Sequence, residues 1–181
     1  MDLADASASV SRPGLLRYLL PCLIHRLGGR PSGGARFEVS QQIAIGKPKS
    51  TGIMEITWNC DRLLHLNAHL QEDVELIRQR RSPLLEKATE FAGLALAVCA
   101  VHEYLPGRRV QSLNSGRAPD MYLSLAEDAG IEVAGRNSGL SAYRRAIQVK
   151  IGDMEQRDDL VEAYVSIWGL DVTLGCKRRI R

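Results

Sequence analysis

The stretch from residue 83 to about residue 105 most constrains the fold, because it is long enough for a helix of several turns and is apolar on most of its sides. Leucine, valine, phenylalanine and alanine fill most of its positions, and Ser82-Pro83 with Glu86 is typical of a helix start. A helix of this kind is buried. The rest of the chain must therefore supply the surfaces that cover it.

The remaining segments predict a mixed α/β fold. Before the buried helix we expect a helix, a β-hairpin and a second helix, over residues 15–27, 36–58 and 61–80. After it we expect strands at 109–113, 120–125 and 131–134, a helix at 140–156 and a strand at 160–168. We divide the chain accordingly into an N-terminal extension, residues 1–80, and a core, residues 83–181.

Length and cysteine content suit an intracellular domain. A chain of 181 residues is the size of one domain with an extension, and it needs no disulfide or metal to fold. Its four cysteines lie too far apart for a zinc ribbon or a CxxC redox pair. Residues 15–27 are too short and too often interrupted for a membrane helix, and the acidic start does not suit a signal peptide. We therefore expect a cytoplasmic protein with no membrane partner.

Two carboxylates fall on neighbouring predicted strands. Asp120 follows Pro119 at the start of one strand, and Glu132 lies on the next strand, twelve residues later. A tight hairpin can bring both to one edge of a sheet, where a hard divalent cation would bind them together with water and a substrate phosphate. Such a cation activates water and neutralises charge at a phosphodiester. The pattern predicts a site for Mg²⁺ or Mn²⁺.

The segments GRAPDMYLSL and GIEVAGR resemble the motif of the PD-(D/E)XK nuclease superfamily. The resemblance covers residues 83–168 and implies a restriction-endonuclease-like core, with Asp120 and Glu132 as metal ligands. Many members add a carboxylate from the preceding helix, for which Glu90 is the first choice and Glu86 the alternative. The structural alternative is a turn residue at 120 and a solvated strand residue at 132.

One position departs from the family pattern, because the usual lysine falls at Ala134. Residues two apart in a strand share a face, so a lysine there would lie over the metal beside Glu132. Losing such a group typically costs about a hundred- to a thousandfold in rate. Three explanations are open: Arg136 or Lys150 reaches the same space, the protein is a non-cutting relative, or an original lysine has been replaced. On this reasoning Ala134→Lys should raise cleavage, whereas Val133→Lys should mainly destabilise.

Arginine is strongly favoured over lysine, 19 to 5. Arginine binds phosphate through two parallel hydrogen bonds, so the bias suits a phosphate-rich partner, although a GC-rich genome would produce the same bias. Arg117, Arg136, Arg144 and Arg145 lie near the proposed site in sequence, and we expect them to contact nucleic-acid phosphates. Their alternative role is that of solvated surface charges.

Other motifs give weaker signals. His65 and His69 have the four-residue spacing of a zinc-binding pair, but the HExxH pattern is missing and an exposed surface pair is favoured. The sequence contains no P-loop, GxGxxG or GxSxG pattern, so nucleotide triphosphatase, dinucleotide and serine hydrolase functions have no motif support.

The sequence thus predicts a Mg²⁺- or Mn²⁺-dependent endonuclease that hydrolyses DNA phosphodiesters, with Asp120, Glu132, Glu90 and Arg136 in its active site, or a catalytically impaired relative. The first alternative is a non-catalytic nuclease-like module that binds nucleic acid or a protein, with its N-terminal half as the recognition or homodimer surface. The second is an α+β interaction module such as a regulatory subunit, because fold does not fix function. Metal binding separates the enzyme from both alternatives, and salt-sensitive DNA binding separates the alternatives from each other.

Overall fold

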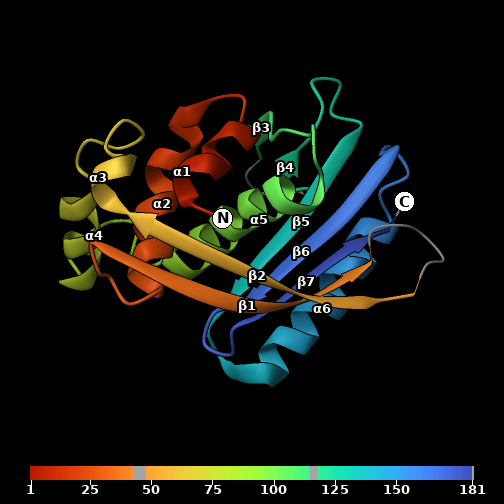
Figure 1. Cartoon of the computed structure of the whole chain (residues 1–181). Helices are drawn as coiled ribbons and strands as arrows, with labels where there is room; N and C mark the ends of the chain where they lie inside the picture. Colours follow the sequence, from red (N-terminus) through yellow and green to blue (C-terminus); the bar gives the residue numbers. More distant parts are fainter. Residues whose placement is uncertain (43–47, 115–117, 181) are drawn as a thin grey trace.

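The computed structural model describes residues 1–42, 48–114 and 118–180 (Figure 1). Its helices are α1 (Leu3–Ala6), α2 (Leu16–Arg26), α3 (Cys60–Leu63), α4 (Leu70–Arg78), α5 (Ala88–Tyr104) and α6 (Gly139–Glu155), with short 3-10 turns at Ser7–Ser9 and Pro13–Leu15. Its strands are β1 (Ser32–Gln42), β2 (Ser50–Asn59), β3 (Ser112–Leu113), β4 (Met121–Tyr122), β5 (Ala129–Arg136), β6 (Glu162–Gly169) and β7 (Leu174–Arg179). These elements confirm the predicted α/β class.

The seven strands of the described chain form one mixed sheet, in the order β2-β1-β7-β6-β5-β4-β3. The pairs β5–β6 and β1–β7 are parallel, and the other neighbours are antiparallel. A crossover helix, α6, connects β5 to β6, as a parallel pair requires. From α5 to β6 the chain runs helix, three antiparallel strands, helix and strand, which is the predicted order.

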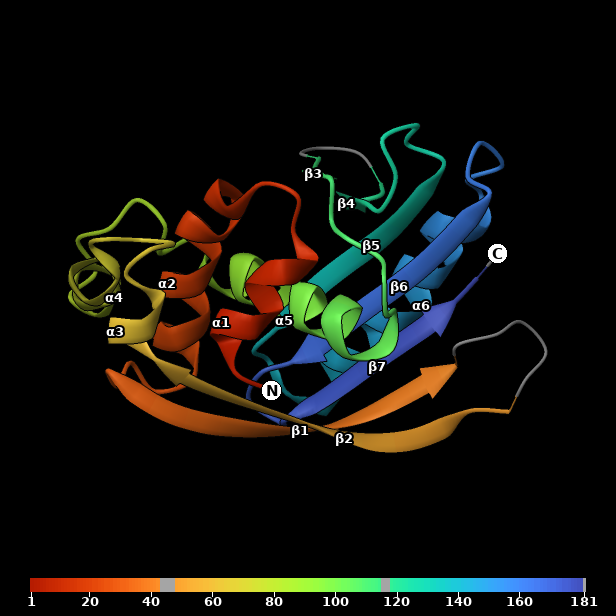
Figure 2. The ribbon, with the colours of Figure 1, turned by 45° about the horizontal axis from the view of Figure 1, so that its top comes forward.

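Helices cover both faces of this sheet (Figures 1 and 2). On one face α5 packs against β5 and β6, and α2 packs on α5, so that α1–α4 gather at one end of the long β1–β2 hairpin. On the opposite face α6 packs against the same two strands. The apolar helix α5 is thus enclosed by the sheet and by other helices, as its sequence requires.

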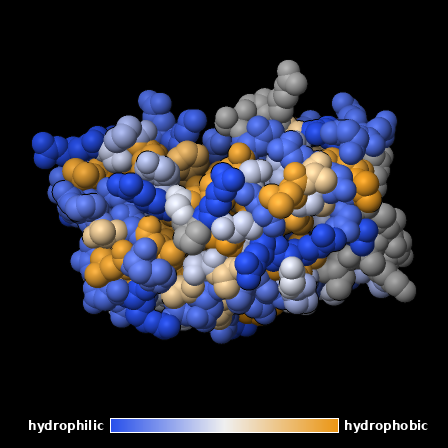
Figure 3. Space-filling view, turned by 90° about the horizontal axis from the view of Figure 1, so that it is seen from above, coloured by the Kyte–Doolittle hydropathy of each residue, from blue (hydrophilic) through white to orange (hydrophobic). Residues whose placement is uncertain are grey.

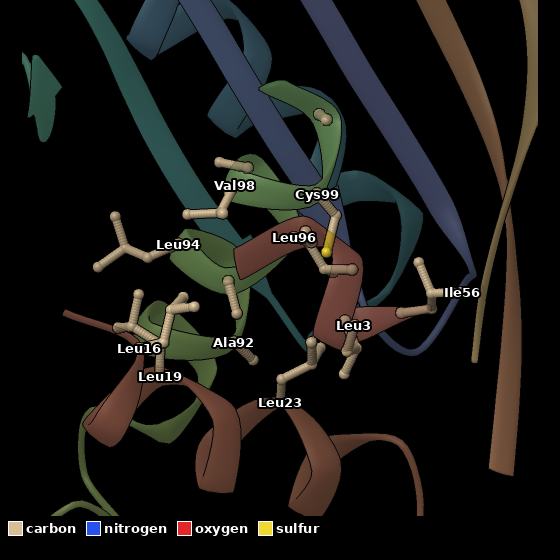
Figure 4. Close-up of a cluster of buried hydrophobic side chains, with 14 of the residues drawn as sticks. Leu3, Leu16, Leu19, Leu23, Ile56, Ala92, Leu94, Leu96, Val98 and Cys99 are labelled. Atoms are coloured by element: carbon tan, nitrogen blue, oxygen red, sulfur yellow. The ribbon is translucent and has the colours of Figure 1, made fainter. Parts of the chain in front are cut away.

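One large hydrophobic cluster joins α5 to the N-terminal helices and to the sheet. Figure 4 shows Leu16, Leu19 and Leu23 of α2 on the side of the cluster that faces Ala92 of α5, with Leu3 of α1 beside them. Residues from both sides of position 80 contribute to the cluster. The N-terminal elements and the rest of the chain therefore share a common core.

The N-terminal hairpin extends the sheet through aromatic packing as well as through backbone hydrogen bonds. Phe37 of β1 meets Trp168 of β6 edge to face, with ring centroids 5.5 Å apart, and both rings are fully buried. Such pairs add roughly 0.5–1.5 kcal/mol beyond the burial of their area. The indole N–H of Trp168 donates to Ser166 Oγ at 2.9 Å, so the buried ring leaves no unpaired donor. The predicted hairpin is confirmed, although residues 43–45 of its first strand lie outside the described residues.

The prediction of one continuous helix over residues 61–80 is wrong, because a turn separates α3 from α4. Asn67 is buried in that turn and its amide donates to the backbone carbonyl of Arg17 (3.0 Å) and to the carboxylate of Asp73 (2.8 Å). Its side-chain oxygen accepts the backbone N–H of His69 at 2.9 Å. An asparagine that bonds to nearby backbone in this way competes with the helical hydrogen bonds.

The buried helix begins at Ala88, five residues later than expected. Residues 83–87 form turns, and Ser82 Oγ accepts the backbone N–H of Leu84 at 3.1 Å. The strands predicted at 109–113 and 120–125 are also shorter than expected, as β3 and β4. The hydrophobic pattern located these elements but did not fix their ends.

The C-terminal strand β7 was not predicted, because its run of basic residues resembles a solvated tail. It lies between β1 and β6, and Lys177 within it is only 3% exposed. The Lys177 ammonium lies 5.3 Å from the ring centroid of Tyr104, and burial lowers the pKa of this lysine to about 8. Backbone pairing to strands on both sides outweighs the cost of burying this charge.

The outer surface shows no large apolar area on the face seen in Figure 3, where hydrophobic residues are interspersed among hydrophilic ones. In the described part of the chain, every helix lacks the combination of length and apolar character that a membrane crossing demands. The four cysteines are buried free thiols.

A close backbone contact between α5 and β5 gives a stability prediction. A Cβ on Gly135 would overlap the Thr89 carbonyl, and a Cβ on Gly93 would lie 2.5 Å from Gly135 N. Because backbone cannot move aside cheaply, Gly135→Ala is expected to destabilise by about 3 kcal/mol and to lower Tm by roughly 6–12 °C. Gly152→Ala in α6 is the matched control: nothing lies within 4 Å of its Cβ, so it should be neutral or stabilise by up to about 1 kcal/mol. Equal Tm values for both variants in thermal unfolding would contradict the tight contact.

Candidate active site

The β4–β5 hairpin brings Asp120 and Glu132 together, as predicted. Asp120 immediately precedes β4, which pairs with β5 through Met121 and Ile131. The Asp120 carboxylate accepts the backbone N–H of Val133 at 2.7 Å, so this side chain lies across the middle of β5. Both carboxylates line the same cavity, which has a volume of about 760 Å³.

A lysine from the following helix reaches this carboxylate pair. Lys150 of α6 donates from Nζ to Glu132 Oε1, and the two charged groups form an ion pair. The Glu132 side chain is 4% exposed and that of Lys150 is 21% exposed, so water screens the pair only weakly. The site thus contains an ammonium group although residue 134 is alanine.

Successive side chains of β5 point to opposite faces of the sheet, as expected for a strand. Glu132 and Ala134 both point toward α6, where Ala134 packs with Tyr143 and Ala146. Val133 points to the other face and belongs to the large core cluster around α5. The expectation that residue 134 is a neighbour of Glu132 and that Val133 enters the core is confirmed.

Further charged residues line the cavity around this centre. Glu90 comes from α5 and is exposed, Arg136 comes from the end of β5, and Asp153 lies one turn beyond Lys150 on α6. Arg157 lines the same cavity and pairs with Asp159. Four carboxylates therefore line one cavity together with one ammonium and two guanidinium groups.

The electrostatic balance leaves the buried carboxylates short of positive charge. Burial raises the pKa of Asp120, and Glu90 adds to this, while the Val133 N–H and Lys150 offset it only in part. Burial likewise raises the pKa of Glu132 despite its bond to Lys150, and the charge of Asp120 adds to the effect. Burial alone would lower the pKa of Lys150, but the bond to Glu132 and the charges of Asp120 and Asp153 raise it. An added cation would stabilise the ionised carboxylates.

The residues present fit a magnesium-type ion in part. Glu132 Oε2 is buried and accepts no hydrogen bond from the described part of the chain, so one carboxylate oxygen at the cavity is left for a ligand. Within residues 1–42, 48–114 and 118–180, no group of three or more His, Cys, Asp or Glu side chains has the arrangement of a metal centre. Mg²⁺ commonly takes only one or two protein carboxylates and completes its shell with water and substrate phosphate. The pair Asp120 and Glu132 meets that requirement, whereas the role of Glu90 as a third ligand stays a prediction.

The remaining predicted site residues that the structure describes are not found in the cavity that contains Asp120 and Glu132. Glu86 is exposed in the turn before α5 and lies outside the cavity. Arg144 and Arg145 are exposed on α6 and also lie outside it. Arg117 lies outside the described residues.

The histidine pair does not have the geometry of a zinc site. His65 and His69 lie in the turn between α3 and α4, so their four-residue spacing is not helical, and both are exposed. His65 Nδ1 contacts the Arg62 carbonyl oxygen at 3.0 Å, and His69 Nδ1 contacts the Glu72 carboxylate at 3.3 Å. The interpretation of these histidines as surface residues is confirmed.

Sequence reasoning missed Asp153 and Arg157. A signal was present for Asp153, because it follows Lys150 by three residues and therefore shares a face of α6 with it, whereas Arg157 lies two residues beyond the end of that helix. That face could be recognised as part of the site only once Lys150 was known to point toward Glu132.

The chain matches no protein-family model, and neither a curated protein nor a solved structure matches it.

Proposed function

We propose that this protein is a metal-dependent phosphodiester hydrolase that acts on DNA, built on a restriction-endonuclease-like core formed by α5, β3, β4, β5, α6 and β6. The observation that carries the proposal is the contact of Lys150 with Glu132 in the cavity that also contains Asp120. It supports the explanation in which the lysine has moved from position 134 to the following helix. The order and pairing of the core elements also agree with the resemblance in sequence.

Each residue then has a distinct task. Asp120 and Glu132 would hold Mg²⁺ or Mn²⁺, with Glu90 near enough to influence Asp120. The bound ion would polarise the phosphodiester and lower the pKa of a coordinated water. Lys150 orients that water and offsets the negative charge that develops on the phosphoryl oxygens. Arg136 at the cavity wall stabilises the same charge but cannot act as a base, because guanidinium stays protonated.

The alternative function is a non-catalytic module on the same core. Two observations favour it: Lys150 already pairs with Glu132, and no third carboxylate completes a metal centre in the described residues. In that case the Lys150–Glu132 pair would be a structural ion pair beneath a binding surface.

Nicking of supercoiled plasmid separates the two functions. The enzyme is expected to convert supercoiled to open-circular DNA when Mg²⁺ or Mn²⁺ is present, and to stop when EDTA is added, because the carboxylates alone do not activate water. The Asp120→Asn protein, purified in the same way, controls for a contaminating nuclease. DNA binding without cleavage in either metal would instead support the non-catalytic module.

A further inference from the structure

A second polar cavity lies between α6, β1 and β7. It is separate from the cavity that contains Asp120, Glu132 and Lys150, which we call the cleft from here on. Its polar lining comes from Ser40, Gln41, Gln42, Lys49, Gln148, Lys177 and Arg178. The strand register explains how they meet: Ser40 pairs with Cys176 and Gln42 with Arg178, so these alternate residues of β1 and β7 share the face that α6 covers. Its volume of about 40 Å³ would hold roughly three water molecules, or one small polar group.

The cavity is positively charged. Lys49 and Arg178 both lower the pKa of the Cys176 thiol, which burial raises, so both cations lie near this cysteine in the cavity lining. The described lining residues include no aspartate or glutamate. Arg178 Nε is buried and has no hydrogen-bond partner among the described residues. This guanidinium donor therefore lacks an acceptor that an anion would supply.

Helix α6 places this cavity on the other flank from the cleft. Gln148 and Ile151 of α6 line the cavity, whereas Lys150 and Asp153 of the same helix line the cleft. An α-helix with its side chains is about 10–12 Å wide, so the two sites are separated by little more than one helix. Arg144 precedes Gln148 by four residues and is exposed on the same helix flank, which adds a further cation near the cavity.

We propose that Lys49 and Arg178 bind a backbone phosphate of the nucleic acid whose scissile phosphate lies in the cleft. The inference rests on the proposed function, because it takes the polynucleotide as the source of the phosphate. A strand held in the cleft by metal and Arg136 would cross the exposed side of α6 and place a neighbouring phosphate on the second site. The site positions the strand and reads no base sequence, as is usual for phosphate contacts.

DNA affinity measured over a salt series tests the inference. Fluorescence anisotropy with a labelled 20-base-pair duplex in EDTA reports binding without cleavage. For the Lys49→Gln/Arg178→Gln protein we expect weaker binding. We also expect the plot of log binding constant against log salt concentration to be less steep, by about 1 to 2 in slope, because fewer counterions are released when phosphate contacts are lost. The control Arg12→Gln/Arg81→Gln removes the same charge from exposed positions in the N-terminal half and should leave the slope unchanged.

Two further variants keep the result interpretable if the double variant folds poorly. Gln148→Glu changes an exposed residue and adds a negative charge at the cavity, so it should also weaken binding. Lys49→Gln with Arg178→Lys retains one cation and should recover part of the affinity. An unchanged slope in both the double variant and Gln148→Glu, with plasmid nicking intact, overturns the phosphate site and leaves the proposed function standing.

The source of the phosphate is tested separately. If inorganic phosphate at constant ionic strength raises the Tm of the wild-type chain but not that of the double variant, while both bind duplex equally, the site takes a free phosphate and the backbone assignment is wrong. If the double variant shows the smaller salt slope but the wild-type chain never nicks plasmid, the phosphate site stands and the proposed hydrolase activity does not.

Discussion

Replacing Lys150 by alanine is expected to lower Mg²⁺-dependent plasmid nicking by about a hundred- to a thousandfold, the scale of one preorganised charge at a reacting centre. Lys150 is the ammonium group in contact with Glu132, and alanine at 134 cannot replace it. The variant also leaves Glu132 buried without its charged partner, so its folding must be checked by thermal unfolding. Lys150→Arg keeps the charge and is the control for stability.

The decisive variant moves the lysine back to the strand. Residue 134 shares a face with Glu132, so Ala134→Lys in the Lys150→Ala background brings an ammonium to the same carboxylate. We expect this double variant to nick plasmid at least about tenfold faster than Lys150→Ala, which is part of the effect of one such charge. Initial nicking rates of the single and double variants, under matched metal and salt, give the comparison. A double variant no faster than Lys150→Ala would show that Lys150 does not take the role proposed for a lysine at position 134.

The structure also changes the expectation for Ala134→Lys alone. From the sequence, this variant should gain activity, because no lysine was known to reach the proposed metal site. In the folded chain Lys150 is already in contact with Glu132, and Ala134 is packed between β5 and α6 with 3% exposure. A second ammonium would be repelled by the first and would disturb this packing. We therefore expect a gain only when Lys150 is absent.

The sequence sufficed for those parts of the site that depend on local geometry. Asp120 and Glu132 lie on adjoining strands of one short hairpin, and the alternation of side chains places Val133 and Ala134 on opposite faces. These relations need only the strand period and a turn. They could therefore be derived without knowing how the rest of the chain packs.

The sequence did not suffice where an element's rotation or pairing depends on distant residues. The choice between Arg136 and Lys150 depends on which flank of α6 faces β5, and packing of Tyr143, Ala146 and Met154 against the sheet sets that rotation. The strand β7 depends on its pairing with β1, more than a hundred residues earlier in the chain. Local charge patterns carry no information about either arrangement.

Replacing Asp120 by asparagine is expected to abolish nicking, by about a thousandfold or more, while making the metal-free protein more stable at neutral pH. The activity is lost because an amide is a poor Mg²⁺ ligand and one of only two central carboxylates disappears, so both the metal and its activated water are affected. The amide oxygen can still accept the N–H of Val133, which preserves the local fold. A loss of activity together with a gain in stability is the signature of a functional group that the fold tolerates at a cost.

The stability effect follows from the raised pKa of Asp120. In the unfolded chain this carboxyl ionises near its ordinary value of about 3.9, whereas burial holds its pKa higher in the folded state. Between these two pKa values the folded state binds more protons, so stability is present at low pH and is lost as pH rises through the folded pKa. Asparagine has no charge to bury, so the Asp120→Asn protein does not lose this stability as pH rises. The Tm of Asp120→Asn in EDTA should therefore exceed that of the wild-type chain at pH 7, and the difference should shrink toward pH 4.

Metal reverses the order of stability. On the proposed function, Mg²⁺ or Mn²⁺ binds the carboxylate pair of the folded chain alone, so a saturating metal concentration should raise the Tm of the wild-type chain and leave that of Asp120→Asn almost unchanged. Glu132→Gln is the contrasting variant: it also removes one carboxylate but leaves the Lys150 ammonium without its counter-charge, so it should lose activity without the gain in stability. Thermal unfolding at pH 4 and pH 7, with EDTA and with metal, measures all three proteins in one series. An Asp120→Asn protein that is less stable than the wild-type chain at pH 7 in EDTA, or that still nicks plasmid, would contradict both the buried charge and its role as a metal ligand.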